Sequence, residues 1–175
     1  MSVVQSAERV GLGIDIGGNN TRFGLVNDQC VVLDKGSIRT NIHKEVNDFI
    51  DALYSAVAPL LEKHLSGQAL TGIGVGVPNG NFYTGTVEYA PNLPWKGVIP
   101  FGELISEKFG VPCKITNAAN AAAQGEMLFG AAQGMKDFIM MTLGTGVGSG
   151  IVANGSLIYG HDGFAGELGH TIVKP

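Results

Sequence analysis

One strand–turn–strand unit occurs twice in this chain, and the repeat constrains the fold more than any other feature. When the sequence is shifted by 127 residues, Ile16-Gly17 falls on Leu143-Gly144 and Asn27 falls on Asn154. Asn154-Gly155 is itself a strong hairpin-turn signal. The repeat predicts a duplicated α/β lobe with a cleft between its two copies. The alternative is that two glycine hairpins coincide by chance.

The rest of the chain has the periodicity of alternating strands and helices. The first three strands are expected to form an antiparallel meander. Pro59 should kink or divide the first helix, because proline removes a backbone donor and clashes with the preceding turn. Residues 81–99 are expected to be irregular. Strands are predicted over 10–16, 21–26, 30–39, 70–77, 111–116 and 138–143, and helices over 43–65, 101–109 and 118–132.

The second copy is much shorter than the first. The first extends over about 120 residues, whereas the second has fewer than 40 and contains its strands but not its helices. The sequence therefore predicts a first lobe over 1–117 and the start of a second lobe over 118–175. We expect the intact protein to continue for roughly another lobe.

Composition argues against several functional classes. The net charge is −4 and no Lys/Arg cluster exists, so there is no electrostatic footprint for nucleic acid. There is no secretory signal and no apolar run of about 18 residues, so a membrane partner is not expected and the cytoplasm is favoured. Cys30 and Cys113 lie far apart in predicted strands, where free buried thiols are expected in a reducing compartment.

Two glycine turns have the composition of a phosphate-binding cradle. Asp15 stands just before Gly17-Gly18, and the later copy contains Gly144-Thr145-Gly146. Backbone N–H groups at such turns bind phosphate, and a carboxylate beside them can hold Mg²⁺ through water. Neither a Walker A loop nor a dinucleotide-binding fingerprint is present. The alternative is that these glycines serve only sharp turns and close packing, and that Asp15 caps its turn.

A group of polar residues follows the later glycine turn. Glu167 and His170 stand beside glycines near the end of the chain. A carboxylate and an imidazole, together with the amide of Asn117, offer the donors and acceptors that a polyol requires. A lone Glu-x-x-His is a weak signal, so its meaning depends on the motifs that precede it.

Four motifs together resemble the ROK family of sugar kinases and repressors, and their order and spacing match along essentially the whole chain. They are Asp15-Ile16-Gly17-Gly18, Asn117-x-x-Asn120, Leu143-Gly144-Thr145-Gly146 and Ala165-Gly166-Glu167-Leu168-Gly169-His170. The likeness is closest to the glucokinase-like kinases. It implies an α/β, actin-like (ribonuclease H-like) fold of the hexokinase superfamily, present as the first lobe and the beginning of the second. It also implies transfer of the ATP γ-phosphoryl group to a hexose, usually at O6, and a homodimer or homotetramer when full length.

The resemblance implies a role for each matching residue. Asp15 orients hydrated Mg²⁺. The residues implied to surround the ATP phosphates are Gly17, Gly18, Asn19, Gly144, Thr145 and Gly146. Those implied to contact or close over the sugar are Asn79, Gly80, Asn92, Asn117, Glu167 and His170.

Three positions depart from the family pattern. Ala118 stands where the family has an aspartate, the expected general base, and loss of a base typically costs on the order of 10²–10⁴-fold in rate. Asn19 replaces a threonine. His170 would normally be one ligand of a zinc ion whose three cysteines are expected within about 15 residues downstream. Zinc is therefore expected only in a longer chain.

The leading interpretation is an ATP-dependent hexose kinase that acts on glucose. A sugar-sensing repressor would carry a helix-turn-helix domain ahead of the first hairpin, and the nine residues before Val10 leave no room for one. A non-catalytic sugar-binding protein is favoured by Ala118, which cannot accept a proton.

Overall fold

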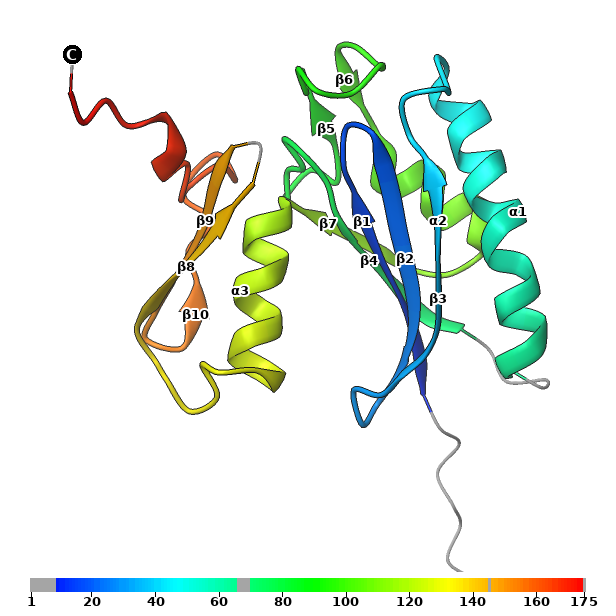
Figure 1. Ribbon diagram of the computed structural model, residues 1–175, viewed down its shortest axis with the longest axis horizontal. Coiled ribbons are helices and arrows are strands. Elements are labelled where there is room, and N and C mark those ends of the chain that lie inside the picture. Colours follow the sequence, from blue (N-terminus) through cyan, green and yellow to red (C-terminus); the bar gives the residue numbers. More distant parts are fainter. Residues whose placement is uncertain (1–8, 66–69, 145, 175) are drawn as a thin grey trace, which may run out of the picture.

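The computed structural model describes residues 9–65, 70–144 and 146–174, and its largest element is a five-stranded sheet (Figure 1). The strand order is β3-β2-β1-β4-β7. The first three strands form the predicted antiparallel meander, whereas β4 and β7 run parallel to β1. The strands are β1 (Val10–Ile16), β2 (Asn20–Asn27), β3 (Val32–Arg39), β4 (Leu70–Gly76) and β7 (Cys113–Thr116).

Two helices, α1 (Val46–Leu65) and α2 (Phe101–Phe109), cover one face of this large sheet. Their apolar residues recur at helical spacing and pack into one core with alternate residues of the strands. α2 ends at Gly110, whose φ of 70° is a left-handed conformation that glycine adopts readily. The fully buried side chains of this core include Leu12, Ile16, Phe49, Leu53, Val57 and Phe101.

Pro59 does not divide α1, so that part of the prediction is wrong: the helix continues through it. Pro59 is exposed. Water can therefore bind the carbonyl oxygen of Ser55, which loses its intrahelical donor. Packing of the buried face holds the helix together.

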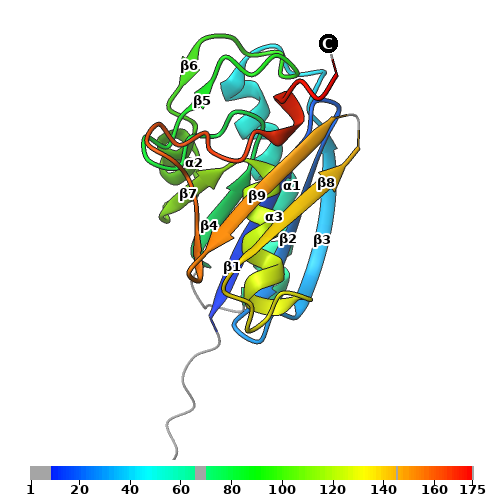
Figure 2. The ribbon, with the colours of Figure 1, turned by 90° about the vertical axis from the view of Figure 1, so that its left-hand side faces the viewer.

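A second part of the molecule contains a three-stranded sheet of order β10-β9-β8. Its strands are β8 (Phe138–Leu143), β9 (Val147–Ala153) and β10 (Ser156–Leu157). α3 (Ala118–Phe129) lies between this small sheet and the large one in Figure 1, and Figure 2 shows the small sheet in front of the helix. The helix approaches β9 closely because Gly148 faces Ala119 and Gly150 faces Ala123, so that no larger side chain separates the backbones. A 3₁₀ turn, η1 (Leu168–His170), follows.

The structure confirms the duplicated hairpin. β1 pairs with β2 and β8 pairs with β9, both antiparallel, and Asn154-Gly155 turns the chain into β10 with φ of 52° and 73°. Three residues separate the two strands in each copy, 17–19 between β1 and β2 and 144–146 between β8 and β9. The shift of 127 residues places Thr142 of β8 at the position of Asp15 in β1.

The region 81–99 contains more structure than predicted. A short antiparallel pair, β5 (Val87–Glu88) and β6 (Val98–Ile99), lies within it. Cys30 stands in a turn with φ of 62°, not in a strand, which corrects the prediction. Both cysteines are free and half-buried, and burial raises the pKa of the Cys113 thiol to about 12. Among the described residues, no helix is both long and apolar enough to cross a membrane.

Candidate functional site

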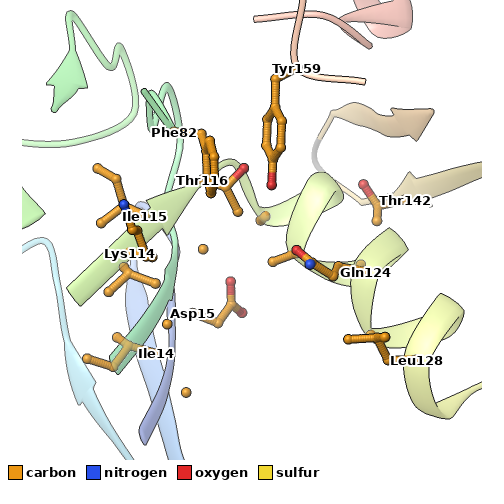
Figure 3. A pocket seen from close by; sticks show the side chains of 18 of the residues that line it. Ile14, Asp15, Phe82, Lys114, Ile115, Thr116, Gln124, Leu128, Thr142 and Tyr159 are labelled. Atoms are coloured by element: carbon orange, nitrogen blue, oxygen red, sulfur yellow. The ribbon is translucent and has the colours of Figure 1, made fainter. Parts of the chain in front are cut away.

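A cavity of about 700 Å³ lies between the large sheet and α3. Asp15 reaches it from β1 and Thr142 from β8, so the two equivalent positions of the repeat face the same space (Figure 3). Ala118 and Thr116 line it near the start of α3, and Tyr159 lines it from the loop that follows β10. The repeat therefore creates an inter-sheet cleft, as predicted.

Part of the cavity lining on the large sheet is backbone, at Gly13, Gly74 and Gly76. Gly13 of β1 pairs with Gly24 of β2 and with Gly74 of β4, so three neighbouring strands carry no side chain in this row. In the adjoining row Asp15 pairs with Arg22. Within the described parts of the chain, Asp15 makes no ion pair with any residue, and its exposed carboxylate is available to a ligand.

The two glycine turns differ in what surrounds them. A Cβ on Gly18 would lie 2.7 Å from the carbonyl oxygen of Asn92, so close packing against that loop is sufficient to require glycine there. Nothing lies within 4 Å of a Cβ built on Gly144 or Gly146, so that turn is open. Thr145 falls outside the described residues. The close-packing alternative therefore applies to the first turn, whereas the second turn has space for a ligand.

Asn19 is held in the first turn by its neighbours. Its side-chain oxygen accepts a hydrogen bond from Asn41 Nδ2 at 3.3 Å, and its backbone oxygen accepts one from Thr40 N at 2.9 Å. Gly17 N donates to Asn20 O across the same turn at 3.0 Å. These bonds tie the turn to the end of β3.

Asn117 and Glu167 are brought together by the fold. Asn117 caps α3: its Oδ1 accepts from Asn120 N at 2.7 Å. Its Nδ2 lies 3.4 Å from Glu167 Oε1, 50 residues away in sequence. His170 Nε2 lies 3.9 Å from Glu167 Oε2, and the imidazole is largely exposed. These three side chains, from the start of α3 and from η1, can all reach one polyol.

Asn79, Gly80 and Asn92 have structural partners of their own. Asn79 Nδ2 donates to Glu88 O at 2.9 Å, and a Cβ on Gly80 would lie 2.7 Å from Thr116 O. Asn92 is exposed and lines a separate pocket of about 460 Å³ beside Gly18. None of Asn117, Glu167 and His170 lines that pocket. Gly80 thus packs on Thr116, the neighbour of Asn117, whereas Asn92 lines a different pocket, and a role of the three residues in sugar binding stays a prediction.

Ala118 is the first residue of α3 and is exposed to the cavity. The backbone there lies close to β4, since a Cβ on Gly76 would be 3.3 Å from Ala118 Cα. A side chain at position 118 would extend into the space that Asp15 and Thr142 face. Helix N-termini favour negative charge, so an aspartate at this position would be stabilised in its deprotonated form.

Groups that could hold a metal ion are limited. No cluster of three His, Cys, Asp or Glu side chains occurs in residues 9–65, 70–144 and 146–174. His170 has a single carboxylate beside it, which is too few ligands for structural zinc. Asp15 alone fits Mg²⁺ that keeps most of its water and is bound mainly by phosphate oxygens.

Several residues of the cleft were missed from the sequence. Thr142 could have been found by carrying the 127-residue shift from Asp15. Phe82 and Tyr159, whose rings stack at 4.1 Å between centroids, carry no local signal that they meet. Asn120, which the sequence motif already contains, does not line the cavity; it is buried, and in the described residues neither of its side-chain amide atoms has a hydrogen-bond partner.

Comparisons with known proteins agree on one family. The family model that matches is described as "ROK family" and covers residues 11–175. A glucokinase of Halalkalibacterium halodurans is 37% identical over 97% of this chain and 52% of its own length. A xylose repressor of Caldicellulosiruptor bescii is 34% identical over 93% of this chain and 41% of its own.

A solved structure gives the same result in three dimensions. The ROK family glucokinase from Streptomyces griseus, in complex with glucose and AMPPNP, superimposes with a TM-score of 0.81 at 35% identity, covering 95% of this chain and 51% of that one. The chain spans about half the length of the curated relatives it matches. The α/β architecture is the actin-like fold, present as the first lobe and the beginning of the second. The chain belongs to the ROK family.

Proposed function

We propose that the chain is the sugar-binding and phosphate-facing part of an ATP-dependent hexose kinase, with glucose as the substrate and the γ-phosphoryl group as the transferred group. The observation that carries the proposal is that Asp15 and Thr142, at equivalent positions of the repeat, line one cleft together with the start of α3. The glucokinase relatives and the glucokinase complex with a nucleotide analogue support it.

The nucleotide phosphates would lie against the open turn at Gly144–Gly146 and approach Asp15. A Cβ on Gly144 or Gly146 would meet nothing within 4 Å, which suits close approach of an anion, although the Gly144 N–H already donates to Gly146 O at 3.0 Å. Asp15 would hold hydrated Mg²⁺, whose chemistry is to neutralise charge on the phosphates. The complete protein would supply the adenine site and, with downstream cysteines beside His170, a structural zinc site.

The sugar would lie between the start of α3 and η1. Asn117 Nδ2 can donate to a hydroxyl, the Glu167 carboxylate can accept from another, and the His170 imidazole can donate or accept. Asn79, Gly80 and Asn92 would act on the sugar only through the loops they shape. We assign the first lobe to residues 1–117 and the start of the second to 118–175.

Ala118 argues against efficient kinase activity, because alanine cannot act as the general base. Phosphoryl transfer depends mainly on positioning and charge stabilisation, so a cleft without the base can retain slow transfer. Sugar binding, in contrast, does not require the base. Binding is therefore the cleaner test of the proposed site.

The test is calorimetric titration of the full-length protein with glucose, followed by an assay for glucose-dependent ADP release. Glu167→Gln should weaken glucose binding by about tenfold or more, because it removes a charged acceptor. Glu107→Gln is the matched control: Glu107 is exposed on α2, away from the cleft. Absence of hexose binding by the wild-type protein would overturn the proposal.

A second candidate is a sugar sensor without transferase activity. Ala118 and the matching xylose repressors favour it. A protein that binds a sugar in the titration, but releases no ADP even after Ala118→Asp, would be such a sensor.

A further inference from the structure

Two loops from opposite sides of the cleft meet and pack on each other. The first, residues 79–89, follows β4, and the second, residues 158–166, follows β10. Phe82 and Tyr159 stack with centroids 4.1 Å apart and planes 10° apart (Figure 3). Tyr83 adds an edge-on contact to Tyr159 at 6.0 Å. Both stacked rings line the cavity that Asp15 faces.

Two hydrogen bonds and one close packing contact join the same loops. Tyr83 Oη donates to Gly160 O at 3.0 Å, and Asn81 Nδ2 donates to Asp162 O at 3.0 Å. Gly163 has φ of 87°, and a Cβ on it would lie 2.6 Å from Asn81 Oδ1. Glycine is therefore required at 163 by both its conformation and its neighbour. We call these seven residues, Asn81, Phe82, Tyr83, Tyr159, Gly160, Asp162 and Gly163, the interlobe latch.

The first half of the latch is held by several hydrogen bonds within its own loop. Asn81 is 5% exposed, and its Oδ1 accepts from Tyr83 N at 3.0 Å. Its Nδ2 also donates to Glu88 Oε1 at 3.0 Å, and Thr86 Oγ1 donates to the same carboxylate oxygen at 2.7 Å. A loop held by this many internal bonds offers a fixed surface on which the second loop can dock.

The second half of the latch leads directly to the proposed sugar site. Ala165 N donates to Tyr159 O at 2.9 Å, and Gly166 O accepts from Ser149 Oγ on β9. Glu167 follows at once and lies 3.4 Å from Asn117. The segment that carries Glu167 is thus attached to the first lobe at one end and to the small sheet at the other.

We propose that the interlobe latch positions Glu167 opposite Asn117, and that the Phe82–Tyr159 stack thereby sets the affinity of the sugar site. The inference rests on the proposed function. Phe82 and Tyr159 are positioning residues, since they act on the sugar through the loop that carries Glu167. A small displacement of a positioned polar group is sufficient to lose a directional hydrogen bond. Burial, together with Tyr83, raises the pKa of Tyr159, so its ring stays neutral in the stack at physiological pH.

Glucose titration of full-length variants tests the latch. Tyr159→Leu and Phe82→Leu should each weaken glucose binding about tenfold, the scale of a lost aromatic pair. Tyr159→Phe keeps the stack and should stay within about twofold of the wild type. The double variant should bind no worse than either single variant, because both remove the same contact.

A matched control separates positioning from general loss of stability. Tyr54 and Phe109 form another aromatic pair, at 5.1 Å between α1 and α2 and away from the cleft. Tyr54→Leu should lower thermal stability and leave glucose affinity unchanged. Tyr159→Leu with wild-type glucose affinity would overturn the inference, as would equal effects of Tyr54→Leu and Tyr159→Leu.

Amide hydrogen exchange gives a readout that needs no sugar. Tyr159→Leu should speed exchange in both residues 79–89 and 158–170, while exchange in β1 stays slow. Unchanged exchange in both loops would show that the stack does not hold them together, and would overturn the latch. Absence of hexose binding by the wild-type protein would instead count against the proposed function, and the exchange result would then decide the latch alone.

Discussion

The two copies of the repeated hairpin differ first in burial: the outer face of the first is buried and that of the second is exposed. Three apolar residues of β1 are at most 4% exposed, whereas the three residues of β8 at equivalent positions are at least 52% exposed. The equivalent pairs are Leu12 and Ile139, Ile14 and Met141, and Ile16 and Leu143.

The difference comes from what covers each face. α1 packs its buried residues on the first hairpin, whereas no helix of the described chain packs on the outer face of β8. On the other face α3 reaches both strands of the second hairpin. Apolar residues at equivalent positions are therefore buried in the core in the first copy and exposed on the surface in the second. We propose that a later part of the full-length protein covers β8, since the chain spans about half the length of its relatives.

Substitution at equivalent positions of the repeat should give the largest contrast. In the 175-residue chain, Leu12→Ala should lower the free energy of unfolding by about 2–5 kcal/mol, because it opens a cavity in a packed core. Ile139→Ala should cost less than about 1 kcal/mol, because its side chain already meets water. Urea unfolding measures both. Similar losses of unfolding free energy in the two variants would show that the outer face of β8 is buried in the 175-residue chain.

The same two substitutions, made in the full-length protein, test whether a later segment covers β8. If a later segment covers β8, the cost of Ile139→Ala should rise into the range of about 2–5 kcal/mol there. An unchanged small cost in both lengths would mean that this face stays exposed.

The cavity-facing positions of the repeat should differ in a second way, through charge. Asp15→Asn should weaken binding of ATP to the full-length protein about tenfold when Mg²⁺ is present, because it removes the carboxylate for the hydrated ion. Thr142→Val removes only a hydroxyl and should cost about threefold or less. Titrations with and without Mg²⁺ measure the contrast, and the effect of Asp15→Asn should disappear without the ion. An equal loss with and without Mg²⁺ would contradict the metal role.

The smallest expected effect concerns a link between α1 and β3, the strand that follows the first hairpin. Asp34 of β3 accepts from Lys63 Nζ at 2.8 Å and from His64 Nε2 at 2.9 Å, at the end of α1. These bonds, with Lys63 first, hold the pKa of Asp34 well below its ordinary value. Their contribution is therefore present above the unfolded pKa of about 3.9 and is lost as the pH falls below it.

Asp34→Asn should flatten the acid limb of the curve of stability against pH. Asp28→Asn, in an exposed turn, is the control and should leave the curve unchanged. Thermal unfolding between neutral pH and about pH 3 measures both. An unaltered acid limb in Asp34→Asn would show that the link contributes nothing.

Local sequence patterns were sufficient to predict the strands and helices but not the tertiary contacts between them. The glycine turns and apolar alternation predicted β1, β8 and α2 with the bounds that the structure has. They could not predict that α1 continues through Pro59, because solvent exposure of that turn is a tertiary property. Nor could they predict that Tyr83 reaches Gly160, since the two are 77 positions apart and no local pattern links them.

The candidate site was also predictable only in part from the sequence. The motifs predicted that Asn117 and Glu167 act together, and the fold places them 3.4 Å apart. Asn79 and Gly80 have local partners in the structure, Glu88 O and Thr116 O, and Asn92 lines a separate pocket. Their contribution to the sugar site stays a prediction.

The central claim is that the cleft between the two copies is a phosphoryl-transfer site that lacks only its base. Steady-state kinetics on glucose should compare Ala118→Asp with the unchanged full-length protein. The variant should raise kcat by at least about 10²-fold with little change in glucose affinity. Ala122→Asp, which adds the same carboxylate one turn further along α3 in the same cavity, should give no increase. Equal kcat values for position 118 as alanine and as aspartate would contradict the account.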